Sequence, residues 1–157
     1  MPPFLIPAVS AYNRLMAQSF HRFTGQFIVP DAAVLPDHEL ARALFDAPQA
    51  IVSHGIEADP IFRYANAQAL ELWEMDWAAF TRLPSRLSAE GTPDIQSDRD
   101  ALLRAALETG GIDYYAGVRV SANGQRFEIR NTVLWNVVDT EGVRHGQAAF
   151  IRDWRFL

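Results

Sequence analysis

Two amide side chains are the residues best placed to bind a small molecule. In the run 126–138, Asn131 is the only amide among alternate residues that are otherwise apolar, and such residues share one face of a strand. Gln147 stands in the next such run, on one face with His145, Ala149 and Ile151. Amides on two neighbouring strands could hydrogen-bond the edge of a flat heteroaromatic ligand. Alternatively, they could satisfy backbone groups or each other at the rim of a sheet.

Three tryptophans could enclose a planar ligand beside these amides. Trp73 and Trp77 are four residues apart in a helical pattern, and Trp135 shares the predicted strand face of Asn131. Indole rings can hold a planar ring by stacking, although such residues more often fill a core. Both roles are open for all three side chains.

Arg86, in the segment LPSRLSAE, is the sharpest charged candidate for ligand binding. Its guanidinium could pair with a carboxylate or phosphate at the mouth of a pocket. It could equally pair with Glu90, four residues later along the chain.

Catalytic chemistry has weaker support. His54 and Asp59 form the nearest His–Asp pair, but we expect them at a strand end and in a turn, where a solvated carboxylate is the default. The sequence contains no GxSxG elbow, HExxH helix or glycine-rich phosphate loop. We therefore predict a protein that is not an enzyme, with an isomerase-like or dehydratase-like pocket enzyme as the alternative.

Composition excludes further classes of function. The chain of 157 residues has no cysteine and no lysine, so it can form no disulfide, thiolate metal site or lysine Schiff base. Its net charge is −5 and it has no arginine-dense tract, which argues against nucleic acid and anionic membranes as partners. The N-terminus lacks a basic leader and a long apolar run, so we expect a cytoplasmic protein.

An amphipathic helix is predicted between Pro7 and Gly25, because its apolar residues recur at intervals of three and four. This apolar stripe could pack on the core of its own chain. Leu5, Val9, Tyr12, Met16 and Phe23 also fit the seam of a heptad repeat, so the helix could pair with a second copy. We predict a homodimer through this N-terminal helix.

The remaining elements predict an α+β fold. A short helix from Asp37 leads into strands over 50–55 and 61–65, and Asn66 then caps a helix that carries the first two tryptophans. A further helix, 97–109, is capped by Ser97 and stopped by Gly110. Strands over 114–121, 126–138 and 144–154 follow, the first two joined by a type I′ turn at ANGQ.

Two stretches carry a resemblance to a known family. SHGIEADPIFRYANAQALELWEMDWAAFTRLPSRLSAE and DYYAGVRVSANGQRFEIRNTVLWNVVDTEGVRHGQAAF resemble the MEKHLA domain, a PAS-related domain that occurs alone in bacteria and at the end of plant homeodomain-leucine-zipper regulators. The resemblance implies a five-stranded antiparallel sheet with short helices on one face. It also implies a PAS-like domain over 37–157, preceded by a helical extension and connector over 1–36.

The resemblance implies a sensory or regulatory function for the chain. Such a module would bind a small molecule non-covalently or mediate dimerisation and protein contacts; a protein-interaction domain with a filled core is the alternative. Flavin-binding PAS domains of the LOV type are similar in placing Asn and Gln on these strands, but their photochemical adduct needs a cysteine that this chain lacks. A flavin or other flat heteroaromatic could therefore bind only without a covalent bond. The predicted pocket residues are Trp73, Trp77, Arg86, Asn131, Trp135 and Gln147.

Overall fold

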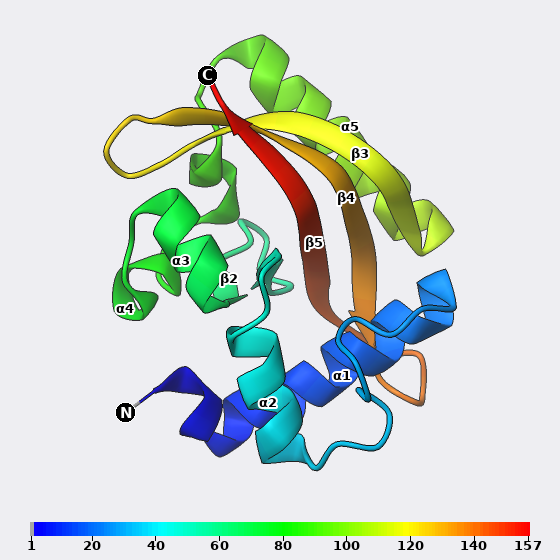
Figure 1. Cartoon of the computed structure of the whole chain (residues 1–157). Helices are drawn as coiled ribbons and strands as arrows, with labels where there is room; N and C mark the ends of the chain where they lie inside the picture. Colours follow the sequence, from blue (N-terminus) through cyan, green and yellow to red (C-terminus); the bar gives the residue numbers. More distant parts are fainter. Residues whose placement is uncertain (1) are drawn as a thin grey trace.

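The chain folds into a five-stranded antiparallel sheet with helices on both faces (Figure 1). The computed structural model describes residues 2–157, and the strand order is β2-β1-β5-β4-β3. The strands are β1 (Ala50–His54), β2 (Phe62–Ala65), β3 (Gly111–Val120), β4 (Arg126–Val138) and β5 (Arg144–Phe156). The helices are η1 (Pro3–Leu5), α1 (Pro7–Thr24), α2 (Asp37–Phe45), α3 (Ala67–Trp73), α4 (Trp77–Phe80), η2 (Ser85–Ser88) and α5 (Pro93–Thr109). The α+β fold class predicted from the sequence is confirmed.

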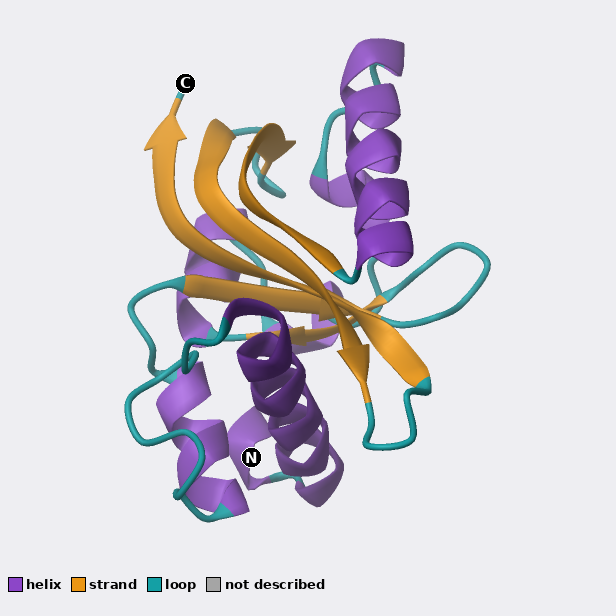
Figure 2. Cartoon of the chain, turned by 90° about the vertical axis from the view of Figure 1, so that its right-hand side faces the viewer, coloured by secondary structure: helices purple, strands orange, loops and turns teal. Residues whose placement is uncertain are grey.

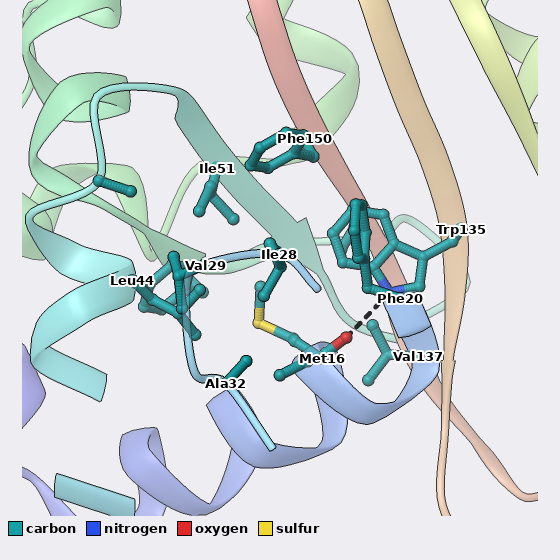
Figure 3. Packing of buried hydrophobic residues seen from close by; sticks show 14 of the residues in the cluster. Met16, Phe20, Ile28, Val29, Ala32, Leu44, Ile51, Trp135, Val137 and Phe150 are labelled. Atoms are coloured by element: carbon teal, nitrogen blue, oxygen red, sulfur yellow. Dashed lines mark hydrogen bonds between the residues drawn. The ribbon is translucent and has the colours of Figure 1, made fainter. Parts of the chain in front are cut away.

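Helices α1 and α2 cover one face of the sheet, which we call the outer face (Figures 1 and 2). The apolar stripe of α1 packs against strand residues there, and the indole N–H of Trp135 donates to the Met16 carbonyl oxygen at 3.2 Å (Figure 3). Phe20 contacts two aromatic rings edge-on or tilted, those of Trp135 and Phe150. The stripe is therefore core within its own chain, as the first of the two sequence-based alternatives proposed.

Helices α3, α4 and α5 cover the opposite, inner face, which the strong bend of the long strands makes concave (Figure 2). Phe127, Ile129 and Ile151 are almost fully buried beneath them. None of the helices formed by residues 2–157 is long and apolar enough to cross a membrane.

Asn66 links the first hairpin to the helices, as predicted. Its Oδ1 accepts hydrogen bonds from the backbone N–H of Ala69, at the start of α3, and of Ile51, in β1. Its Nδ2 donates to the carbonyl oxygens of Leu44 and Gln49. One fully buried amide therefore joins α2, β1 and α3.

Three local predictions were wrong. The helix predicted to carry both Trp73 and Trp77 is two helices, because the left-handed Glu74, with φ of 56°, ends α3 and Asp76 caps α4. Helix α5 begins at Pro93 with Thr92 as N-cap, not at Ser97, because proline fits the first helical turn. The hairpin between β3 and β4 is present, but its turn is not type I′: Gly124 alone in the loop 122–125 has a positive φ, of 85°, whereas type I′ needs two such residues.

Asn131 changes which face each residue of β4 occupies. Its φ is 49°, a left-handed conformation that interrupts the alternation of side chains. Ile129 before it lies on the inner face, but Val133 and Trp135 after it lie on the outer face. The prediction of a single face from Phe127 to Val137 was therefore wrong.

Candidate functional site

A small, partly open cavity lies between the inner face of the sheet and helices α3, η2 and α5; we call it the inner cavity. Its volume is about 50 Å³. Apolar residues form one part of its wall: Phe62, Trp73, Leu103, Ile129, Leu134 and Ile151. Polar residues form another part: Ser53, His54, Ser88, Arg99, Arg119 and Gln147. The cavity is thus lined by charged, hydrogen-bonding and apolar groups together, a mixture also found in the larger pockets, of roughly 300–1,000 Å³, that hold small molecules.

His54 is held by two side-chain hydrogen bonds at the edge of this cavity. Its Nε2 lies 3.2 Å from Oε1 of Gln147, and its Nδ1 lies 2.9 Å from Oγ of Ser85. Gln147 donates through Nε2 to the Leu103 carbonyl oxygen, so its Oε1 is an acceptor and His54 must donate from Nε2. Ser85 then donates to Nδ1 of a neutral imidazole.

Burial, with a smaller contribution from the positive charge of Arg99, lowers the pKa of His54 to about 4. The imidazole is therefore neutral at pH 7, in agreement with the tautomer that the hydrogen bonds require. Both ring nitrogens are occupied, and Asp59 is bonded to Arg86 instead of to His54. The His54–Asp59 pair considered from the sequence does not form.

Two arginines reach the same cavity from different elements. Arg99, on α5, has 7% of its surface exposed, and Arg119, on β3, has 6%. Nη2 of Arg99 donates to Oγ of Ser85 at 2.7 Å, and Nη2 of Arg119 donates to the Tyr115 hydroxyl at 2.6 Å. Burial, with the neighbouring charge of Arg119, lowers the pKa of Arg99 to about 10, so the guanidinium is still charged at pH 7.

A second, partly open cavity is a cleft between α5 and β3. It has a volume of about 130 Å³ and shares Arg99 and Arg119 with the inner cavity. The two arginines therefore border both cavities.

Two of the six residues predicted from the sequence line the cavity. Gln147 does so as described, and the indole of Trp73 donates a 3.3 Å hydrogen bond to the Ser88 carbonyl oxygen. The alternation of Ala149 and Ile151 is correct, since both belong to the inner-face core whereas Ala148 and Phe150 belong to the outer-face core. Gln147, Ala149 and Ile151 all line the cavity.

The other four predicted residues lie elsewhere. Trp77 packs edge-on against Tyr64 of the outer-face core, which also contains Trp135. Asn131 is exposed and bonds Asp153, because its left-handed backbone ends the alternation that placed it inside. Arg86 is exposed and pairs with Asp59 at 3.2 Å, not with Glu90.

Sequence reasoning missed Arg99, Arg119 and Ser85. A signal existed for Arg99, because it falls on the apolar stripe of α5 with Leu102, Leu103 and Ala106 at helical spacing. An arginine within an apolar stripe indicates a buried charge. No comparable signal marks Arg119, because bulges at Ile112/Tyr115 and Tyr115/Gly117 shift the pairing of β3 with β4.

Comparison with known proteins identifies one family. The family model described as "MEKHLA domain" matches residues 10–156. The homeobox-leucine zipper protein HOX29 of Oryza sativa subsp. indica is 26% identical over 155 residues, which is 96% of this chain but 18% of that protein. The chain thus spans less than a fifth of this relative.

Solved structures of PAS and LOV proteins share the fold. The PAS domain of a protein from Colwellia psychrerythraea has a TM-score of 0.62 at 16% identity, covering 73% of this chain and 93% of that one. An RNA-binding light-oxygen-voltage receptor has a TM-score of 0.63 at 23% identity, covering 79% of this chain and 35% of that one.

Proposed function

The chain belongs to the MEKHLA domain family, and we propose on that basis that it is a sensory or regulatory module which holds a small molecule non-covalently in the inner cavity. The observation that carries this proposal is the wall of the cavity. His54 and Gln147 line the cavity and bond each other, and Ser85 behind them bonds His54 and Arg99. Arg99 and Arg119 also line it, and they keep N–H donors that no acceptor of residues 2–157 takes up.

A domain that needed only a stable core would gain by filling this space with apolar side chains. Buried polar groups stabilise a fold only when their hydrogen bonds are made, and unpaired charges are costly. The arrangement of polar donors around unfilled volume therefore supports a binding role over a purely structural one.

A chain of hydrogen bonds supports α1 as the output element. Oγ of Ser53 donates to the backbone carbonyl oxygen of Gln147 at 2.7 Å, so the Tyr12 hydroxyl must be the donor in its own 2.7 Å bond to Ser53. Tyr12 lies on α1, and Gln147 touches the cavity. A ligand that moves β5 would alter this contact between β5 and α1.

We propose no catalytic role for the cavity. The imidazole of His54 is occupied at both nitrogens, and no Asp or Glu lines the inner cavity among residues 2–157. Among the described residues, the inner cavity therefore has no paired acid and base of the kind that an isomerase would need; the His145–Asp139 pair, at 2.9 Å, does not line it.

The experiment is a ligand-observed NMR screen of a small-molecule mixture against the purified chain. Saturation-transfer signals from a subset of compounds are expected for the native chain. They should be lost in Ala149→Phe, which fills the cavity, and retained in Ala101→Phe, on the exposed side of α5. The proposal fails if no compound gives a signal, or if Ala149→Phe gives the same signals as the native chain.

A further inference from the structure

We infer that the ligand of the inner cavity is a short-chain carboxylate, bound as an anion between Arg99 and Arg119. This inference rests on the proposed function and names the chemistry of its ligand. The proposed function leaves the charge of the ligand open, and this inference specifies an anion.

The inner cavity is lined by two positively charged side chains and by no carboxylate of residues 2–157. Arg99 and Arg119 are the two charged side chains in the buried class, and no carboxylate of the described chain is in that class. The closest carboxylate oxygen is Oδ1 of Asp100, 3.9 Å from Arg99, on a side chain that is 61% exposed. Both residues are at most 7% exposed, and the nitrogens that make no hydrogen bond keep contact with solvent. Two positive charges at a largely buried place without a buried counter-charge favour an anion that completes the site.

The guanidinium groups of Arg99 and Arg119 have N–H donors that could bind a carboxylate. Each guanidinium has five N–H donors. Within the described chain Arg99 bonds only Ser85, and Arg119 bonds only Tyr115 and its neighbour Val118. Guanidinium groups match carboxylates in pairs of parallel hydrogen bonds, which makes arginine the preferred partner of this group.

The small volume of the cavity and its apolar lining residues favour a short alkyl tail on the anion. A cavity of about 50 Å³ holds only a few non-hydrogen atoms and is far smaller than the roughly 300 Å³ of pockets for drug-sized ligands. Ile129, Leu134 and Ile151 also line it. A carboxylate with a short alkyl tail would contact both the charged and the apolar residues of the lining, whereas an inorganic oxyanion would leave the apolar residues without a partner.

The surface cleft between α5 and β3 provides the entry path. It contains both arginines and one carboxylate, that of Asp98, which forms no ion pair with either arginine among residues 2–157. An anion that enters the cleft would meet the two guanidinium groups before it reaches the inner cavity.

The test is a titration of the ¹⁵N-labelled chain with sodium acetate, followed by NMR of the backbone and arginine side-chain signals. Acetamide serves as the neutral molecule of the same shape, and sodium chloride controls for ionic strength. Saturable shifts of Arg99, Arg119 and Gln147 signals are expected with acetate alone. Absence of saturation with acetate, equal saturation with acetamide, or saturation by nitrate or phosphate but not by acetate would overturn the inference.

Three glutamine variants locate the site. Arg99→Gln and Arg119→Gln should each weaken acetate binding at least tenfold, while Arg86→Gln, which removes an exposed arginine paired with Asp59, should leave it unchanged. Equal affinity in all three variants would contradict the assignment. If one buried variant does not fold, the other provides the same test, and the comparison of acetate with acetamide needs no variant.

Failure of this inference can be separated from failure of the proposed function. A neutral compound that binds the native chain but not Ala149→Phe would retain the sensory function and reject the carboxylate. Failure of every compound and of acetate would reject both.

Discussion

Two buried tyrosines of the outer-face core, Tyr12 and Tyr64, differ in the hydrogen bonds that their hydroxyls make. The Tyr12 hydroxyl donates to Ser53, whereas the Tyr64 hydroxyl has no partner within the described chain. Burial raises the pKa of both groups, so both hydroxyls are protonated at any physiological pH.

Removal of each hydroxyl should therefore have opposite effects on stability. Tyr12→Phe should lower the free energy of unfolding by about 1–2 kcal/mol, because it leaves a buried serine oxygen without its donor. Tyr64→Phe should leave it unchanged or raise it by about 1 kcal/mol, because it removes an unpaired polar group. Urea unfolding of the two variants beside the native chain measures both values. Similar losses in the two variants would contradict the assigned hydrogen bonds.

The neutral imidazole of His54 predicts a dependence of stability on pH. The folded pKa of about 4 lies below the ordinary value of 6.5, so the unfolded chain binds this proton more tightly. The contribution is complete above pH 6.5 and is lost progressively as the pH falls towards 4. Between pH 7 and pH 5 the loss from this group is about 2 kcal/mol.

Unfolding in urea at pH 7 and pH 5 tests this expectation. His54→Gln should reduce the difference in unfolding free energy between the two pH values by about 2 kcal/mol. His38→Gln, at a side chain that is 75% exposed, is the matched control and should not change the difference. An unchanged difference in His54→Gln would show that the imidazole is not held neutral.

At the residue scale, the sequence predicted the polar cavity residue on β5 but not the two charges. Gln147 could be found because β5 alternates regularly through Ala149 and Ile151. Arg119 could not, because it follows two bulges whose position depends on pairing with β4. Single-residue chemistry is predictable only where the backbone is regular.

The left-handed residue in β4 determines the composition of both cores. Without the reversal at Asn131, Val133 and Trp135 would point towards α5 and not towards α1. The neighbouring strand β5 changes face beside Asn131 as well. Ile151 and Trp154 are three residues apart, yet both pack on the inner-face core.

Substitutions at Asn131 should show this conformational requirement. Asn131→Gly and Asn131→Val both lose the hydrogen bond to Asp153, so the difference between them isolates the backbone. The valine variant should be less stable than the glycine variant by about 1–2 kcal/mol, because a Cβ disfavours left-handed φ values. Chemical denaturation of both measures this difference. Equal stability would mean that the strand can adopt ordinary β geometry here.

At the element scale, prediction succeeded where a residue has a local reason for its conformation. Asn66 caps a helix through its side chain, and Gly25 and Gly110 both end helices with positive φ, as predicted. The left-handed Asn131 has no such local signal in the run RFEIRNTVLWNVV, because its conformation follows from the pairing of β3, β4 and β5.

At the scale of the molecule, α1 behaves as part of the domain core. Tyr12, Met16 and Phe20 are at most 5% exposed, and they pack with residues of α2, β4 and β5. The division of the chain into an extension over 1–36 and a domain over 37–157 stays a prediction.

Deletion of residues 1–24 should therefore destabilise the whole chain. It would expose the apolar outer face around Trp135 and Phe150, so that several aromatic rings that are buried in the intact chain would contact water. We expect loss of the near-ultraviolet circular dichroism signal and aggregation during sedimentation. A truncated chain that unfolds cooperatively like the intact one would contradict this expectation.

The predicted homodimer through the N-terminal helix cannot be tested by deleting this helix, because the deletion would destabilise the whole chain. Its seam would have to use the exposed residues Leu5 and Phe23, since Tyr12 and Met16 are buried. Sedimentation of the intact chain should give a mass near twice 17.6 kDa, and Leu5→Glu with Phe23→Glu should halve it. A single species of 17.6 kDa for the intact chain would reject the dimer.

The position of β5 has a consequence for biosynthesis. β5 is formed by residues 144–156 and lies between β1 and β4, so that Ala50 pairs with Ile151. Before β5 leaves the ribosome, the nascent polypeptide holds two separate hairpins with no strand to join them. The sheet can therefore close only after translation of residue 156, and until then the rings destined for both cores are exposed to chaperones.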